Sequence, residues 1–202
     1  MAKTIMYAAV SADGYVGRLD GEIGSLFDWM GSGDVAWNWI GSDLRTSQAT
    51  KDFLQAVYPT SGIGAMVVGR YVFDQTNGWD GQAVAGDQVF VVTHEAPKDW
   101  EFAGAAPFTF VTDGVESAVA QAREVAGDRI VDVAAGNVGG QALRLGLIDQ
   151  VVMNVVPVVF GEGRPYFGTA AGEVTLADPS LVAQGNRVTH VLYDVPGSAG
   201  KA

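Results

Sequence analysis

The stretch Asp113–Gly146, DGVESAVAQAREVAGDRIVDVAAGNVGGQALRLG, contains the pattern that decides the fold. Its first part predicts an amphipathic helix, which Asp113 and Glu116 begin in the manner of a capping box. A short apolar run at residues 129–134 then predicts a buried strand, and a second helix is expected over residues 138–145. Helices and strands that alternate in this way are typical of an α/β protein with a largely parallel central sheet.

Apolar runs on both sides of this stretch extend the same sheet. Short runs bounded by turn residues predict buried strands. They lie at residues 4–10, 65–69, 88–93, 108–111, 151–160, 181–183 and 188–195. Because the pattern after Asp149 is all-β, we expect the last strands to pair antiparallel at one edge of the sheet. The predicted architecture is a mainly parallel central sheet flanked by helices, with antiparallel carboxyl-terminal edge strands.

The segments between these strands predict further helices and one long covering segment. Apolar residues at near-helical spacing predict a helix over residues 44–58, which Pro59 ends. A short helix is expected over residues 70–74. Residues 11–41 are too many for a structureless loop in a compact domain, so we expect them to fold over another part of the molecule.

The composition excludes several classes of function. The 202 residues include 12 Lys and Arg against 23 Asp and Glu, a formal net charge of −11, and no cysteine. Such an acidic chain is a poor partner for nucleic acid or an anionic membrane, because both are polyanions. Without cysteine the chain has no disulfide, no thiol nucleophile and no Cys-ligated metal.

Length and termini set the expected organisation and location. We expect one domain over residues 1–196 and a flexible tail over residues 197–202. No apolar stretch approaches the ~18 uninterrupted residues of a membrane-spanning helix, and no secretory signal is expected at the amino terminus. The expected compartment is therefore the cytoplasm.

Polar residues follow three of the predicted parallel strands, at the points where those strands end. They are Gly69-Arg70, Thr93-His94 and the junction Ala134–Val138, which opens a helix. Ligands of parallel sheets bind at the carboxyl ends of the strands, where helix N-termini offer free N–H groups to anions. These residues therefore predict a site for an extended phosphate-bearing ligand. Each signal alone is also explained by an ordinary turn or a surface histidine.

Other catalytic templates do not fit the chain. It contains no G-x-G-x-x-G dinucleotide fingerprint, P-loop, G-x-S-x-G or H-E-x-x-H motif. Its two histidines are His94 and His190. Strand alternation predicts that His190 faces outward, so we expect no His-centred metal site.

Five motifs in this order carry a resemblance to a known family. They are Ala8–Gly17, Val68–Arg70, Val91–Thr93, Gly146–Asp149 and Val156–Phe167. Together they resemble the reductase domain of riboflavin biosynthesis and its stand-alone relatives in the dihydrofolate-reductase-like superfamily. The resemblance covers roughly residues 4–168. The zinc deaminase often fused to the riboflavin enzyme is not expected here, because the H-x-E…C-x-x-C signature is missing.

The resemblance implies a function and a set of site residues. The implied activity is NADPH-dependent reduction of a small heterocyclic substrate, pterin-like or ribosylamino-pyrimidinone-like, by a homodimer. The implied cofactor contacts are Ala9, Val16 and Gly17 beside the nicotinamide, Gly69 and Arg70 at the phosphates, Thr93 and His94 at the 2′-phosphate, and Ala135, Gly136, Asn137 and Val138 at the pyrophosphate.

The chain departs from the family at two positions near the expected phosphates. Val72 stands where the family usually has a hydroxyl residue, so one phosphate hydrogen bond is missing. A Gly pair typical of relatives is replaced around Ala135–Gly136, while Gly139 and Gly140 fall inside the following helix. Either these two glycines permit close packing, which we favour, or the phosphate loop has moved to them.

The catalytic group and the substrate pocket are less clearly marked. Asp13 is the candidate substrate-orienting or proton-handling carboxylate, although Asp-Gly is also ordinary turn chemistry. Asp28 is a weaker alternative. Residues 18–60 are expected to shape the substrate pocket, in which Trp29, Trp37 and Trp39 either stack on a flat substrate or simply pack. A non-catalytic module that keeps the fold and binds a nucleotide or pterin is the competing interpretation.

Overall fold

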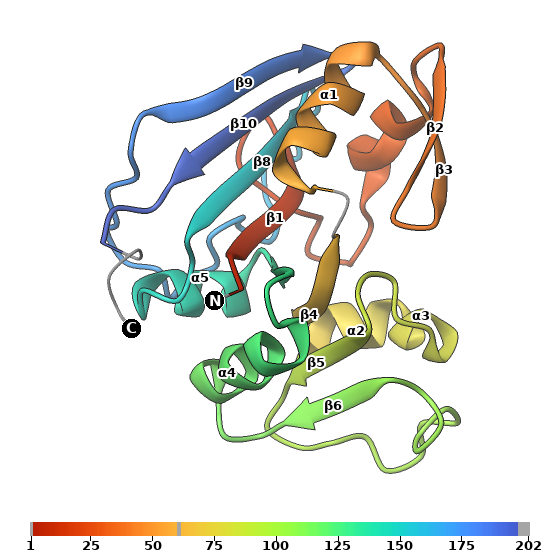
Figure 1. Cartoon of the computed structure of the whole chain (residues 1–202), viewed down its shortest axis with the longest axis vertical. Helices are drawn as coiled ribbons and strands as arrows, with labels where there is room; N and C mark the ends of the chain where they lie inside the picture. Colours follow the sequence, from red (N-terminus) through yellow and green to blue (C-terminus); the bar gives the residue numbers. More distant parts are fainter. Residues whose placement is uncertain (1, 60–61, 198–202) are drawn as a thin grey trace.

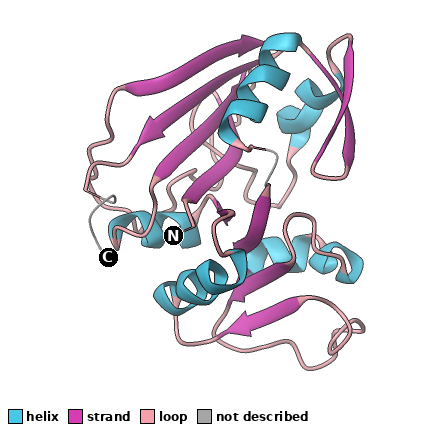
Figure 2. Ribbon diagram, in the orientation of Figure 1, coloured by secondary structure: helices cyan, strands magenta, loops and turns pink. Residues whose placement is uncertain are grey.

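The computed structural model describes residues 2–59 and 62–197, in which one eight-stranded sheet has helices on both faces (Figure 1, Figure 2). The strands lie in the order β6-β5-β4-β7-β1-β8-β10-β9. Their bounds are β1 Thr4–Ser11, β4 Ile63–Gly69, β5 Gln88–Val92, β6 Phe108–Val111, β7 Ile130–Ala134, β8 Gln150–Val156, β9 Pro179–Gly185 and β10 Val188–Asp194.

The six strands from β6 to β8 are parallel, and β10 and β9 add antiparallel pairing at one edge. The central parallel strands are covered on both faces, which is why they are continuous apolar runs. This arrangement confirms the predicted α/β fold with antiparallel edge strands. It also places the carboxyl ends of the parallel strands at one edge of the sheet.

Two helices cover one face. The apolar side of α4 (Val115–Ala126) packs with α5 (Asn137–Arg144) on side chains of β1, β4 and β7, among them Met6, Val67 and Val133. Both helices end on basic last turns, and α4 closes on Gly127, whose φ of 65° suits glycine. The apolar residues that recur at helical spacing within residues 113–146 therefore form one buried stripe, which packs on the sheet.

The opposite face is covered by the amino-terminal part of the chain. The 3-10 helix η1 (Gly24–Gly31), the hairpin of β2 (Val35–Trp39) and β3 (Ser42–Thr46), and α1 (Gln48–Val57) pack over β1, β8 and β10. The two short elements α2 (Arg70–Gln75) and α3 (Asn77–Gly81) flank β4 and β5 (Figure 1). The expectation that the long early segment covers another part of the molecule is confirmed.

Two predicted helix starts were wrong. Residues 42–46 form the second strand of the hairpin, because Ile40 and Gly41 adopt positive φ values of 51° and 80° and reverse the chain there. The helix begins only after Ser47, whose hydroxyl accepts a hydrogen bond from the Thr50 N–H. At α4, Gly114 is the N-cap residue with φ 106° and no side chain caps the helix, so the expected capping box is absent there.

The predicted outward orientation of His190 was also wrong. Its side chain is fully buried, stacks on Phe53 at 4.9 Å and meets Trp29 edge-on at 5.4 Å. The alternation of apolar and polar residues along β10 could not reveal this burial, because α1 and η1 cover the face of the strand that the pattern assigned to solvent. One ring nitrogen lies 2.9 Å from Thr50 Oγ1 and the other 2.6 Å from Asn154 Oδ1. Burial lowers the pKa of His190 from 6.5 to about 4.

This buried histidine predicts a pH effect on stability. The folded state prefers the neutral ring, so His190 lowers the free energy of unfolding progressively as the pH falls from about 6.5 to 4, by roughly 3 kcal/mol in total. Urea unfolding of the wild type and a His190→Gln variant at several pH values measures this contribution. The same comparison with His94→Gln is the control. An equal pH slope in wild type and His190→Gln would refute the assignment.

Two remaining expectations concern membrane-spanning helices and the carboxyl-terminal tail. No helix within residues 2–59 and 62–197 is long and apolar enough to cross a membrane. Apart from Gly197, the expected tail at residues 197–202 lies outside the described residues.

Candidate functional site

Neighbouring strand ends place the predicted phosphate-site residues along one edge. Gly69 pairs with Val92, directly before Thr93, and Tyr7 pairs with Ala134, directly before the Ala135–Val138 junction. The end of β4 also touches the start of α5, because a Cβ on Gly69 would lie 3.1 Å from Val138 Cγ2. The strand ends therefore form one continuous strip.

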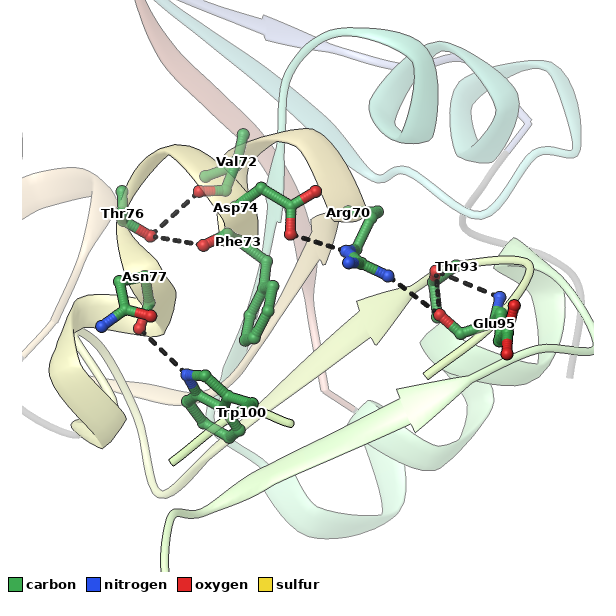
Figure 3. A network of polar contacts seen from close by, with 9 residues as sticks. All are labelled: Arg70, Val72, Phe73, Asp74, Thr76, Asn77, Thr93, Glu95 and Trp100. Atoms are coloured by element: carbon green, nitrogen blue, oxygen red, sulfur yellow. Dashed lines mark hydrogen bonds and ion pairs between the residues drawn. The ribbon is translucent and has the colours of Figure 1, made fainter. Parts of the chain in front are cut away.

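Arg70 and Thr93 converge on a single main-chain group (Figure 3). Arg70 Nη1 and Thr93 Oγ1 each donate to the Glu95 carbonyl oxygen at 2.9 Å. Arg70 Nε also donates to Asp74 at 2.6 Å, which holds the half-exposed guanidinium at the surface of α2. His94 lies exposed on the same loop. A basic side chain and a hydroxyl thus lie together at the ends of β4 and β5.

Val72, where the resemblance led us to expect a hydroxyl residue, packs its side chain against the core under β4 and β5. Its carbonyl accepts a hydrogen bond from Thr76 Oγ1 at 2.9 Å, which closes α2 (Figure 3). The neighbouring turn is held by Trp100 Nε1, which donates to the Asn77 carbonyl at 3.2 Å. These contacts fix the orientation of α2, from which Arg70 projects.

The Ala135–Val138 junction is a tight turn into α5. Gly136 is the N-cap with φ 98°, and its N–H donates to the Tyr166 carbonyl at 2.6 Å. Asn137 Oδ1 accepts from the Thr169 N–H at 3.1 Å. The first N–H groups of a helix have no partners within the helix, and α5 begins directly after the carboxyl end of β7, at the strip of strand ends.

Gly139 and Gly140 are packing positions inside α5. A Cβ on Gly139 would lie 2.8 Å from the Ala134 carbonyl and 2.9 Å from Met6 Cε. A Cβ on Gly140 would overlap the Phe167 carbonyl oxygen. Of the two interpretations stated above, close packing is therefore the one that the geometry supports, and the turn remains at Gly136.

Two motifs far apart in the sequence form one unit beside the end of β1. The Val16 N–H donates to the Arg164 carbonyl, and the Arg164 N–H donates to the Gly17 carbonyl, both at 2.9 Å. The Tyr166 N–H donates to the Gly14 carbonyl at 2.9 Å. Ala9, the other residue expected beside a nicotinamide, is buried in β1. The close pairing explains why both segments are rich in glycine.

Asp13 ties these two segments together. Its carboxylate accepts from Ser11 Oγ at 2.6 Å, from the Gly161 N–H at 2.7 Å and from the Phe160 N–H at 3.1 Å. The Ser11 hydroxyl, followed by these main-chain groups, lowers the pKa of Asp13. An exposed carboxylate held in its charged form is a poor proton donor, so the hydrogen bonds support the turn interpretation. The alternative, Asp28, lies exposed on η1.

A second group of polar residues lies on the α1 face of the sheet and was not singled out from the sequence. Asp132 lies on β7 and is 5% exposed, and burial raises its pKa to about 7. Tyr58 of the α1 carboxyl end lies against it, with the hydroxyl 3.5 Å from Asp132 Oδ1. The sequence signal that could have revealed this group is Asp132 itself, a charged residue in the middle of the apolar run at residues 129–134. Trp29, expected to stack or pack, packs in the core.

Comparison with known proteins decides the family. The family described as RibD C-terminal domain matches residues 2–190. This chain belongs to the RibD C-terminal domain family. The family is of the reductase type, which places the chain among oxidoreductase relatives.

Individual relatives of the family are distant in sequence. The Bacillus subtilis (strain 168) protein YwjB is 24% identical over 174 residues, 86% of this chain and 87% of YwjB. The crystal structure of a putative riboflavin biosynthesis protein from Shewanella sp. PV-4 superposes with a TM-score of 0.61 at 20% identity, covering 96% of this chain and 99% of that one. Dihydrofolate reductase from Enterococcus faecalis, complexed with NADP(H) and RAB-propyl, gives 0.55 at 16% identity and covers 96% of each chain. These similarities confirm the dihydrofolate-reductase-like fold.

Proposed function

We propose that this protein is an NADPH-dependent reductase that transfers a hydride to a small heterocyclic substrate. The observation that carries the proposal is the strip of strand ends, where Arg70, Thr93 and the start of α5 lie beside the glycine-rich unit at the end of β1. Membership of a reductase-type family supports the same activity.

The donors along the strip fit the phosphates of a dinucleotide. The N–H groups of the first turn of α5 suit a pyrophosphate, because a helix N-terminus attracts anions. Arg70 suits a terminal phosphate, with Thr93 and His94 at its side. Because the chain carries a net charge of −11, its overall field opposes a polyanionic cofactor, and the affinity must come from these local groups.

The protein's own part in the reaction is positioning. When bound, the cofactor supplies the hydride. The paired loops at Val16–Gly17 and Arg164 hold main chain close to the end of β1, beside the buried Ala9. Hydride transfer requires the reacting atoms to be about 3–3.5 Å apart, so a fixed main-chain wall at this point favours a productive geometry.

A thermal-shift comparison tests the proposal. We expect NADPH to raise the melting temperature of the wild type more than NADH does at equal concentration. Arg70→Ala and His94→Ala should remove most of this difference, since a hydrogen bond to a charged group contributes roughly 1.5–3 kcal/mol. Arg144→Ala, on the exposed last turn of α5, is the control and should keep it. Equal shifts with both cofactors would contradict the 2′-phosphate assignment.

Turnover distinguishes the reductase from the competing non-catalytic module. We expect NADPH oxidation in the presence of at least one member of a panel of pterins, pyrimidinones and lactones. Cofactor binding without oxidation across the whole panel would favour the module that only binds its ligands.

A further inference from the structure

The side chain of Arg164 links two parts of the strip of strand ends. Its main chain belongs to the paired loops beside the end of β1, where it is hydrogen-bonded to Val16 and Gly17. Its guanidinium reaches away from these loops and stacks on the ring of Tyr71, with Cζ 3.4 Å from the ring centroid. Tyr71 directly follows Arg70 in the first turn of α2. The two side chains therefore form an arginine–tyrosine pair between the end of β1 and the end of β4.

The charge of Arg164 has no counter-ion in the part of the chain that the structure describes. The ion pairs there join Arg70, Lys98 and Arg129 to carboxylates, and none of them involves Arg164. Its Nε atom is buried without a hydrogen-bond partner, and Nη2 makes one long contact of 3.4 Å to the Leu19 carbonyl. A charge that is partly withdrawn from water is costly unless an opposite charge compensates it. In a chain with 23 acidic and 12 basic residues, such an arginine indicates an anion that is not part of the protein.

A second unpaired donor lies in the same place. The Tyr71 hydroxyl is buried and has no hydrogen-bond partner among the described residues. The loop after β1 covers this hydroxyl, because a Cβ on Gly21 would lie 2.8 Å from its oxygen. Native structures seldom keep a buried donor that nothing completes. The N–H groups of a guanidinium and the O–H of a phenol are both matched by the oxygens of a phosphate.

The arginine–tyrosine pair lies on the opposite face of the sheet from α5. Val67 packs beneath α4 and α5, whereas its neighbour Val68 packs beneath α2, because successive side chains of a strand point to opposite faces. The end of β7, where α5 begins, lies between the ends of β1 and β4. Two residues after Arg164, the Tyr166 carbonyl accepts the N–H of Gly136, the N-cap of α5. An anion bound at the start of α5 would therefore lie between this helix and Arg164.

We propose that Arg164 is a further cofactor-positioning residue, which binds the pyrophosphate of the dinucleotide from the α2 side of the strip, with the Tyr71 hydroxyl as a second donor. The Tyr71 ring orients the guanidinium, since a stacked arginine keeps its N–H edge free to bind two phosphate oxygens. Because the main chain of Arg164 holds Val16 and Gly17, a phosphate on its side chain also fixes the cofactor relative to the wall expected beside the nicotinamide. This inference rests on the proposed function, because it requires that the strip binds a dinucleotide.

Calorimetric titration of the full-length protein with four nucleotides tests the inference. We expect Arg164→Gln to raise the Kd of NADPH and that of NADH by the same factor, about tenfold or roughly 1.4 kcal/mol, because both carry the same pyrophosphate. The ratio of the two Kd values should stay as in the wild type, whereas Arg70→Ala should change it. ADP-ribose, which has the pyrophosphate but no nicotinamide, should lose affinity by the same factor. Adenosine 2′-monophosphate has no pyrophosphate and should lose none, a separation that a merely structural role of Arg164 would not produce.

Three further variants sharpen the test. Tyr71→Phe keeps the ring and removes the hydroxyl, so it should weaken the binding of NADPH and NADH equally, but less than Arg164→Gln does. Arg164→Lys keeps the charge without the planar fork and should fall between the wild type and Arg164→Gln. Arg18→Gln is the matched control, because Arg18 is an exposed arginine beside the same paired loops and lies over the Phe160 ring. It removes the same charge and should bind all four nucleotides like the wild type.

The design separates this inference from the proposed function. Tyr71→Phe removes an atom that has no partner in the free protein, so it should fold and keeps the test decisive even where Arg164→Gln does not fold. Unchanged affinity for NADPH in either variant, or an equal loss in Arg18→Gln, would overturn the inference. Equal losses of affinity for ADP-ribose and adenosine 2′-monophosphate in Arg164→Gln would overturn it as well. Failure of the wild type to bind NADPH would instead overturn the proposed function.

Discussion

Replacing Gly140 by alanine is expected to lower the free energy of unfolding by about 3 kcal/mol, at the upper end of the usual cost of overpacking a core. The added Cβ would overlap the carbonyl oxygen of Phe167, a main-chain atom that cannot rotate away. Either α5 or the segment at residues 165–168 must then shift. Each of these two segments has one end at the strip of strand ends, where the cofactor is expected, so the variant should also bind NADPH more weakly.

Urea unfolding of Gly140→Ala measures the effect, with Gly31→Ala as its matched control. A Cβ on Gly31 meets nothing within 4 Å, and Gly31 is exposed at the end of η1. The control should change stability by less than about 1 kcal/mol, as surface substitutions usually do. Equal losses in the two variants would show that α5 does not pack closely at Gly140.

Replacing Asp132 by asparagine is expected to stabilise the protein at pH 8 by about 4 kcal/mol and to change its stability little at pH 4. Burial raises the pKa of Asp132 from 3.8 to about 7, so the folded state holds the proton more tightly than the unfolded chain. The free energy of unfolding of the wild type therefore falls as the pH rises from about 4 to 7. Asparagine has a similar shape and carries no charge, so it removes this penalty.

Urea unfolding of Asp132→Asn and wild type between pH 4 and 8 measures this difference. The control is Asp128→Asn, an exposed acid just before β7. His190 acts in the opposite direction over pH 4 to 6.5, so the wild type should show a flatter pH dependence than either single variant. A loss of stability in Asp132→Asn at pH 8 would contradict the buried, proton-holding carboxyl.

The sequence was sufficient for the sheet and for the strip of strand ends. Apolar runs that alternate with helical patterns are compatible with few folds other than a parallel α/β sheet. Parallel pairing then places Arg70, Thr93 and the start of α5 at one edge of that sheet. The phosphate-site prediction depended only on where strands end, which such patterns indicate well. The preference for close packing at Gly139 and Gly140 rested on the cost of glycine in a helix, and the structure supplies the neighbours that explain it.

The features that were missed depend on contacts between distant segments. The hairpin at residues 35–46 depends on the turn at Ile40, whose φ is positive. The helical spacing of the apolar residues that follow had predicted a helix from residue 44, so the second strand of the hairpin was missed. His190 is buried only because α1 packs over β10, and a strand pattern cannot show what covers its face. Asp132 of β7 meets Tyr58 only because the carboxyl end of α1 lies against the sheet, so no local motif indicates this contact.

A crystal structure of the NADPH complex tests the central claim most directly. We expect the pyrophosphate to lie within hydrogen-bond distance of the first main-chain N–H groups of α5, and the 2′-phosphate to contact Arg70 and Thr93. The nicotinamide should then lie beside Ala9 and the paired loops at Val16–Gly17. A cofactor bound between the β2–β3 hairpin and the carboxyl end of α1, away from the strip of strand ends, would contradict the proposed cofactor site.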